Sequence, residues 1–292
     1  MRMTIPRIRS PRDEHLLGRP PARPNDILLR SAIGLGLLIA IGLLAPVLGF
    51  ADPLAPNLSA QLSPPSFEHL LGTDSLGRDI LSRSVHAITV DLSLALVGVL
   101  CGAVIGAVLG ATAAFGGRSA DMVLPRVAES IQAFPQVLFG MALIAIAGGS
   151  MGALIAIIAI VNVPVYLMMV RAAALPLRTA DFTEAARGAG VSRLRVIVKY
   201  VLPNAMIPVF SQFPLSCTYS IQLIAGLSFI GVGVEPPTPE WGTMIKEGAS
   251  YIVNGVWWPS VVPGLMLVLT TIALGSLSTG LRRTLLKQGT LG

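Results

Sequence analysis

Charged residues are scarce in this chain of 292 residues. Asp, Glu, Lys and Arg make up 12% of it, against the ~25% that is typical of a soluble domain. Hydrophobic residues make up 53%, and the mean hydropathy is +0.74. A soluble protein with so few charges could not cover its surface with polar groups, whereas a bilayer removes that need because the outer surface faces hydrocarbon. The composition therefore excludes an ordinary soluble fold and predicts an integral membrane protein.

Groups that carry chemistry are also sparse. The two cysteines, Cys101 and Cys217, lie in apolar stretches and predict no disulfide, and the three histidines do not follow a metal-ligand spacing. The phosphate-binding pattern G-x-x-x-x-G-K-[ST] does not occur, so the chain is not expected to hydrolyse ATP by that route. With neither a paired nucleophile and base nor a metal cluster in the sequence, we expect no enzyme activity, no metal site and no bound cofactor.

Six apolar stretches are long enough, or nearly so, to cross the hydrocarbon core as helices, which takes about 20 residues each. They are residues 27–50, 90–115, 123–147, 150–170, 206–232 and 259–281. The third stretch is the least regular because it contains Arg126, Glu129 and Pro135. We expect an all-α membrane protein in which a long outer loop, 51–89, separates the first helix from a five-helix core, 90–281.

Positive charge orients this topology in the membrane. Three of the 21 Lys and Arg residues, Arg78, Arg83 and Lys246, fall on one side, and the other 18 fall on the side of both termini. Because cytoplasmic segments carry an excess of Lys and Arg, both termini are expected in the cytoplasm. They form a basic, mostly disordered tail, 1–26, and a short C-terminal tail, 282–292. The net charge of +6 then reflects topology and contact with anionic lipid, not nucleic acid.

The last outer loop, 235–258, ends in two aromatic residues. Trp257 and Trp258 stand where the sixth stretch begins, which is typical of an aromatic belt at the membrane interface. The prolines of this loop are expected to make it rigid.

The inner loop, residues 171–205, carries the most informative pattern. Asp181 and Glu184 have the spacing of a capping box, and residues 185–187 are strong helix formers. A short helix on the membrane face needs a groove on a partner to bury its apolar side. An amphipathic connector lying on the lipid surface is the alternative.

Glycines and a proline divide the rest of this loop. Gly188 and Gly190 favour the end of the first helix, because glycine accepts the left-handed conformation found there. Ser192 is expected to cap a second helix, which Pro203 stops or kinks before the fifth stretch.

The same loop resembles the signature loop of binding-protein-dependent ABC importer permeases. That signature reads E-A-A, three residues, G, nine residues, I, one residue and L-P, and Tyr200 here takes the place of isoleucine. The resemblance implies that the loop is a coupling helix that docks into a cleft on an ATPase subunit. The residues expected to make or shape this contact are Asp181, Glu184, Ala185, Ala186, Arg187, Gly190, Leu202 and Pro203.

Two outer segments, residues 69–83 and 227–245, resemble the C-type permease subunits of the peptide and nickel branch of that family. The resemblance then covers residues 69–281 and implies the type I ABC importer permease fold with six transmembrane helices. The polar residues of these two segments have two possible roles. They could shape the outer loops, or they could dock a substrate-binding protein. The docking candidates are Asp74, Arg78, Asp79, Glu235 and Trp241.

Few polar residues lie inside the spans, and they are the candidates for a translocation path. Hydrogen bonds between helices are the alternative explanation for them. The sequence has no clear pair of acidic or broken-helix sites at mid-membrane, which argues against an ion-coupled secondary carrier. The path candidates are Asn162, Gln212, Ser216, Tyr219 and Gln222.

The resemblance implies a non-catalytic plasma-membrane subunit that moves oligopeptides or dipeptides delivered by a binding protein. Nickel or another small solute is the alternative cargo. The implied partners are a second, homologous permease, two ATPase subunits or one fused ATPase holding ATP and Mg, and an extracytoplasmic binding protein. ATP would close the ATPase subunits and switch the spans between inward- and outward-open states.

Overall fold

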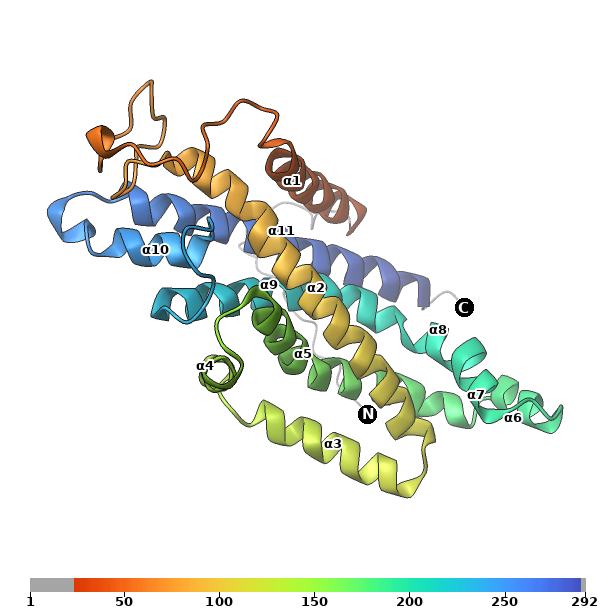
Figure 1. Cartoon of the computed structure of the whole chain (residues 1–292). Helices are drawn as coiled ribbons and strands as arrows, with labels where there is room; N and C mark the ends of the chain where they lie inside the picture. Colours follow the sequence, from red (N-terminus) through yellow and green to blue (C-terminus); the bar gives the residue numbers. More distant parts are fainter. Residues whose placement is uncertain (1–23, 290–292) are drawn as a thin grey trace, which may run out of the picture.

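The computed structural model describes residues 24–289, so almost the whole of the predicted disordered tail lies outside the described residues. Within residues 24–289 the only β feature is an isolated bridge between Thr73 and Asp79. Five of the helices are long and apolar enough to cross a membrane, and a bent helix pair supplies a sixth span if it is counted as one. The prediction of an all-α membrane fold is confirmed (Figure 1).

The five long helices carry the architecture. They are α1 (Pro24–Leu44), α2 (Ile80–Phe115), α5 (Met151–Ala174), α9 (Ile207–Ile230) and α11 (Trp258–Gly289). The bent pair is α3 (Arg118–Gln132) and α4 (Gln136–Ala147). The short helices are α6 (Asp181–Gly188), α7 (Arg193–Val196), α8 (Leu202–Ala205) and α10 (Trp241–Ala249).

Helix α2 begins at Ile80, ten residues before the predicted start at Val90. Asp79 caps it, because its carboxylate accepts a hydrogen bond from the Ser82 N–H at 2.8 Å. The helix has 36 residues, which corresponds to about 54 Å at 1.5 Å per residue. That length exceeds the ~30 Å hydrocarbon core, so the last part of the predicted outer loop is instead the outer end of this helix.

The third predicted span, 123–147, is wrong as a single helix. The structure divides this region into α3 and α4, whose axes meet at 95°. Pro135 stands at the break, where it lacks an N–H and disfavours a helical conformation at the residue before it. Helix α1 also ends early, at Leu44 rather than at residue 50, and Pro46 lies in the turn that follows.

Helices α2 and α5 form the most extensive helix pair of the fold. Glycines recur every four residues along the face of α2 that meets α5, and a Cβ atom added at any of them would lie 2.5–2.7 Å from an atom of α5. Small residues at this spacing let two helix backbones approach closely inside a membrane. The four are Gly98, Gly102, Gly106 and Gly110.

Replacing Gly106 by valine should push these two helices apart. A Cβ at this position would lie 2.7 Å from the Tyr166 Cβ and 2.7 Å from the Val163 carbonyl oxygen. Overpacking of this kind costs about 1–3 kcal/mol or more, so the melting temperature in detergent should fall by several degrees. Gly226→Val in α9 is the matched control, because no atom lies within 4 Å of its added Cβ. An equal loss in both variants would contradict the close α2–α5 contact.

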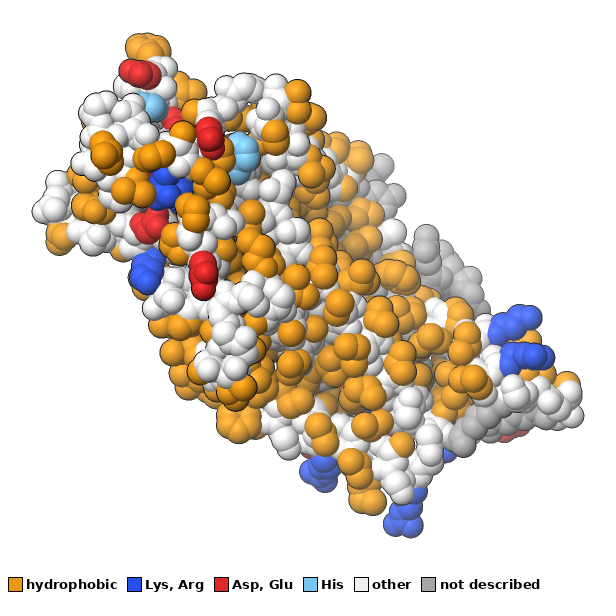
Figure 2. Space-filling view, in the orientation of Figure 1, with side chains coloured by type: hydrophobic (Ala, Val, Ile, Leu, Met, Phe, Trp, Pro, Cys, Tyr) orange, Lys and Arg blue, Asp and Glu red, His pale blue; other side chains and the backbone are white. Residues whose placement is uncertain are grey.

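The charged ends of the molecule flank a hydrophobic band, as Figure 2 shows on one face. Helix α1 begins beside the end of α11, since a Cβ at Gly280 would lie 2.8 Å from the Leu28 Cα. Figure 1 places these helix ends toward the end of the molecule that carries α6 and α7. This arrangement agrees with the start of α1, the end of α11 and the inner loop on one side of the membrane, and the identity of that side as cytoplasmic stays a prediction.

Candidate functional site

The inner loop folds as the short helix α6, a glycine turn and a second helical stretch that runs from α7 to α8. Helix α6 begins at Asp181 as predicted, but the Thr183 and Glu184 N–H groups donate to the Ala180 carbonyl, at 2.8 and 3.1 Å. Ala180 therefore takes the cap position, and the predicted capping box is not what starts the helix. Asp181 and Glu184 instead lie in the first turn, where their negative charges stabilise the helix by interacting with the positive end of its dipole.

Gly190 ends this helix in the way the sequence predicts. Its φ angle is 76°, in the left-handed region that glycine tolerates best. The N–H of the next residue, Val191, donates to the Ala186 carbonyl at 3.1 Å. Together these features form a Schellman motif, which sets the direction in which the chain leaves α6. Gly188 still belongs to the helix.

Pro203 does not stop the second helix. The chain passes from α7 through a π turn, Ile197–Val201, into α8, and the Leu202 N–H donates to the Ile197 carbonyl. A π turn rearranges the backbone hydrogen bonds next to a residue that has no N–H to donate. The side-chain amide of Asn204 also donates to the Tyr200 carbonyl at 2.6 Å. Of the two predicted outcomes, a stop or a kink, the stop does not occur, because this rearrangement carries the helical path through the proline.

One face of α6 is anchored to the body of the protein. Thr183 is fully buried, and its hydroxyl donates to the Leu177 carbonyl at 2.7 Å. Ala186 packs against the hydrophobic core, as does Leu202 further along the loop. The anchored face fixes α6 to the segment that follows α5.

The opposite face of α6 is exposed. It presents Asp181, Glu184 and Ala185 together with Phe182, whose side chain is 40% exposed. Phe182 was not among the predicted contact residues, although an aromatic residue on a short inner helix is a readable signal. Pro203 is also exposed, and the predicted side-chain contact of Arg187 lies outside the described part of the chain.

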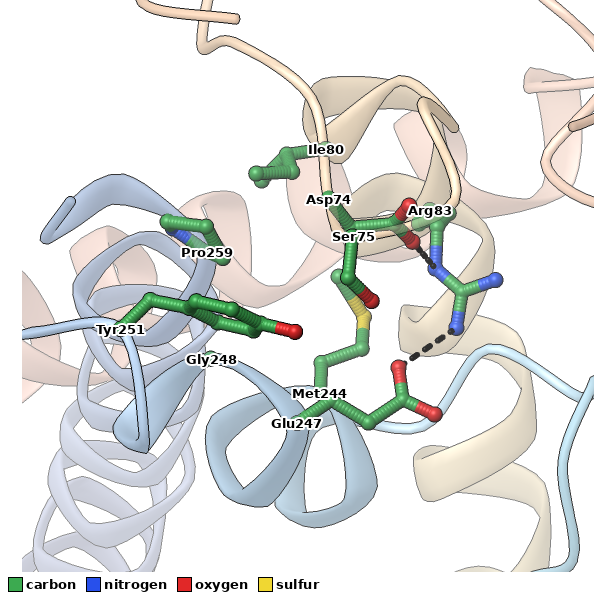
Figure 3. Close-up of a pocket in the computed structure, with 9 residues that line it drawn as sticks. All are labelled: Asp74, Ser75, Ile80, Arg83, Met244, Glu247, Gly248, Tyr251 and Pro259. Atoms are coloured by element: carbon green, nitrogen blue, oxygen red, sulfur yellow. Dashed lines mark ion pairs between the residues drawn. The ribbon is translucent and has the colours of Figure 1, made fainter. Parts of the chain in front are cut away.

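At the other end of the molecule, four charged side chains form what we call the outer ion cluster: Asp74, Arg78, Arg83 and Glu247. Arg78 donates to the Asp74 carboxylate at 2.7 Å and to Glu247 at 3.2 Å. Arg83 lies 3.5 Å from Asp74 and 3.8 Å from Glu247, as the dashed lines in Figure 3 mark. Arg78 is only 3% exposed and Arg83 only 1%. A buried charge is costly unless paired, so the cluster holds α10 against the outer loop.

Two tryptophans also anchor this end. The Trp258 indole N–H donates to the Thr73 carbonyl at 3.1 Å, and that of Trp241 donates to the Ser84 carbonyl at 3.0 Å. Trp258 is 8% exposed, so its predicted place in an interfacial belt is wrong: its indole binds the outer loop instead. Trp257 remains on the surface.

A buried carboxylate that was not predicted caps helix α10. Glu240 accepts hydrogen bonds from the Gly242 and Thr243 N–H groups, both at 2.7 Å. Asp91 of α2 accepts the Trp241 N–H at 3.2 Å. Glutamate is not a favoured residue at a helix cap, so the sequence offers little signal for this role.

Burial corrects the expectation for the docking candidates. Asp74, Arg78 and Trp241 are buried, so their side chains shape the outer surface rather than present themselves on it. Asp79 caps α2 and lies 3.0 Å from the His69 Nδ1. Glu235 is the one of the five candidates with an exposed side chain.

The path candidates divide into two groups. Asn162 and Ser216 are buried, and the Asn162 amide donates to the Ile158 carbonyl at 2.9 Å and to the Ser220 hydroxyl at 3.2 Å. The hydrogen bond to Ser220 links α5 to α9, as expected for the alternative role. Tyr219 and Gln222 are exposed on α9, and Gln212 is partly exposed.

Comparison with known proteins agrees with this architecture. Residues 92–287 match the family model of the binding-protein-dependent transport system inner membrane component. The chain is 37% identical to a di/tripeptide transport system permease protein, DppC, of Pseudomonas aeruginosa, over 85% of this chain and 84% of that protein. It is 33% identical to a probable D,D-dipeptide transport system permease protein, DdpC, of Escherichia coli, over 88% and 86%.

A dipeptide transport system permease protein, DppC, of Alkalihalophilus pseudofirmus is 32% identical over 90% of this chain and 86% of its own length. The family match covers about two thirds of the chain, and each of these three relatives aligns over most of both proteins. The apolar spans, the inner helix turned by Gly190 and these alignments agree with one another. The chain therefore belongs to the family of binding-protein-dependent transport system inner membrane components.

Proposed function

We propose that this chain is the permease subunit of an ATP-driven importer of dipeptides or oligopeptides. The observation that carries the proposal is the inner loop, which exposes one face of α6 and anchors the other. Since the sequence lacks a phosphate-binding loop, the energy for transport has to come through such a contact. The chain itself is then non-catalytic, and ATP and Mg bind to the partner subunits.

The chain is a multi-pass protein of the plasma membrane. Its helices supply five or six spans, and the family that it belongs to consists of inner membrane components. Six spans form only half of a closed path in our proposal, so a second, homologous permease supplies the other half.

The geometry of α6 suits a coupling contact. Phe182 projects from the exposed face, and a partly exposed aromatic side chain is a typical anchor in a protein interface. Thr183, on the anchored face, ties α6 to the segment after α5 through the Leu177 carbonyl. A movement of a docked ATPase subunit would therefore reach α5 directly. Two ATPase subunits, or one fused ATPase, would engage the two permeases.

The peptide substrate follows from the relatives. The three quoted above carry di/tripeptide, dipeptide and D,D-dipeptide in their names. An extracytoplasmic binding protein would select the peptide and deliver it to the outer end of the spans. The exposed Glu235 and the surface shaped by the outer ion cluster are the parts of this chain proposed to receive it.

Purification of the tagged chain from its own membrane in mild detergent tests the proposal. We expect a second permease and ATPase subunits in defined stoichiometry. In liposomes, the complex should transport dialanine only when two conditions are met. ATP must be present on the side of the membrane that carries the ATPase subunits, and binding protein must be present on the opposite side. Uptake by this chain alone, driven by an ion gradient and indifferent to ATP, would replace the proposal with a secondary carrier.

A further inference from the structure

A hollow runs along helix α5, and the sequence predictions did not include the residues that line it. It consists of a shallow, open concavity on the protein surface, which we call the inner chamber, and an adjoining, more enclosed elbow chamber of about 150 Å³. Gln132 and Val165 line both chambers, so the two meet at these side chains. We call the two chambers together the α5 hollow. None of the five predicted path residues lines it.

The hollow occupies the half of the span that leads to the inner loop. Its lining on α5 runs from Val161 to Ala173, while the helix ends at Ala174. The twelve steps between these two residues correspond to a rise of about 18 Å, more than half of the ~30 Å hydrocarbon core. The α5 hollow therefore has the position of a vestibule on the side of α6.

The break between α3 and α4 lies in the wall of the elbow chamber. Backbone that leaves the helical path at membrane depth persists only where protein buries it or where it lines a water-filled cavity. Gln132 ends α3 and Gln136 begins α4, and both amides are exposed beside this chamber. Phe134 and Phe139 stack with ring centroids 6.0 Å apart and also line it. The break thus places two amides and two aromatic rings at one point of the hollow.

The lining has the chemistry of a surface that accepts many peptides. A glutamine amide both donates and accepts hydrogen bonds, as does the backbone amide that all peptides share. Met168 and Met169 line the inner chamber, and methionine adapts its shape to different side chains. No residue lining either chamber carries a charge, so the lining gives no preference for acidic or basic peptides.

We propose that the α5 hollow is the inner half of the peptide path, and that Gln132 is the side chain at its junction that hydrogen-bonds the peptide backbone. This inference rests on the proposed function, because it names the route by which that function works.

Charge substitution at Gln132 tests the proposal. In liposomes with ATP and saturating binding protein, uptake of alanyl-glutamate and alanyl-lysine would be measured for the variants Gln132→Lys and Gln132→Glu. We expect Gln132→Lys to favour the acidic peptide and Gln132→Glu the basic one, since opposite charges a few Å apart attract and like charges repel. The ratio of alanyl-glutamate uptake to alanyl-lysine uptake should be about tenfold or more higher in Gln132→Lys than in Gln132→Glu, with the wild type between the two.

The matched control is the same pair of substitutions at Gln61, an exposed glutamine of the outer loop that lies outside the hollow and is not a path candidate. The ratio of the two uptake rates in these control variants should stay within about twofold of the wild-type ratio. The tenfold change expected at Gln132 corresponds to ~1.4 kcal/mol and is much larger. Equal losses for both peptides in the Gln132 variants, or a ratio that changes at Gln61 and not at Gln132, would overturn the proposal.

A second variant covers the case in which a charged Gln132 prevents folding. Ala172→Phe narrows the inner chamber, so uptake of ditryptophan should fall much more than uptake of dialanine. A uniform loss or no loss would overturn the assignment of the hollow. If the wild-type complex takes up no peptide at all, the proposed function fails instead, which separates the two results.

Discussion

Gly190→Pro should abolish ATP-driven peptide uptake and the stimulation of ATP hydrolysis by loaded binding protein, while the chain still inserts into the membrane. Proline holds φ near about −65°, whereas the chain at Gly190 has a φ of 76°. The turn would have to open, and the bond from the Val191 N–H to the Ala186 carbonyl would break. Helix α6 would then leave in another direction and its exposed face would miss the ATPase. Uptake and hydrolysis in the reconstituted complex are the measurements.

Two controls separate the turn from its surroundings. Gly190→Asn should retain most of the activity, because asparagine tolerates the left-handed conformation better than other non-glycine residues do. Gly188→Ala should be harmless, since Gly188 is the last residue of α6 and no atom lies within 4 Å of its added Cβ. Normal uptake and normal stimulation in Gly190→Pro would end the assignment of α6 as the coupling helix.

Reversal of charge on the exposed face gives a companion test in the same assays. Glu184→Lys places a cation in the first turn of α6, where the helix dipole favours an anion. It also reverses the charge that the ATPase would meet, so coupling should fall while the turn at Gly190 is unchanged.

Arg83→Met should lower the stability of the outer end by several kcal/mol. The arginine is 1% exposed and lies between Asp74 and Glu247 in the outer ion cluster. Without Arg83, Arg78 alone faces the two carboxylates of Asp74 and Glu247, and the cluster keeps a net negative charge. Leaving a buried charge without compensation typically costs about 3–5 kcal/mol. Methionine keeps much of the length of the side chain, so the loss reports the charge rather than a large cavity. Thermal unfolding in detergent and protease cleavage in residues 51–79 are the measurements.

Arg126→Met is the matched control for the same substitution. Arg126 pairs with Glu129 at 3.4 Å, but its side chain is 80% exposed. Exposed ion pairs contribute about 0–1 kcal/mol, so this variant should melt within a degree or two of the wild type. Equal shifts for the two arginines would mean that burial does not decide the strength of the outer ion cluster.

Hydropathy predicted most of the fold because the bilayer fixes the length of a spanning helix. It placed α5, α9 and α11 within a few residues of their observed ends, apart from the extension of α11 beyond residue 281. It failed where a local backbone rule outweighed apolar content, as at Pro135. It also missed the outer turns of α2, because their serines and His86 lower the hydropathy of a segment that is nevertheless helical.

The inner loop was predictable because its signals are local. The left-handed conformation of Gly190 and the start of α6 depend on neighbours in sequence, and the predictions for both agree with the structure. The outer ion cluster was not predictable, since Arg78 and Glu247 are 169 residues apart and only the tertiary fold brings them together. The four-residue glycine repeat of α2 and the exposed Phe182 were readable signals whose roles appear only once the packing is known.

The path residues show a third kind of limit. A polar residue inside a span can face a neighbouring helix or an open hollow, and the sequence does not tell which. Asn162 faces Ser220, whereas Gln132 stands at the break that hydropathy did not predict. Hollows of this kind depend on how the elements are bent relative to one another.

Helix α2 has the properties of a lever. No proline interrupts its 36 residues, its outer end lies beside the outer ion cluster, and its middle is locked to α5 by the glycine repeat. Over a length of about 54 Å, each 5° of tilt displaces one end by about 5 Å relative to the other. A small tilt imposed on α2 near the membrane face that bears α6 would thus displace its outer end by more than the ~3.3 Å rise of one residue in a β-strand. No proline kink in α2 would absorb this movement.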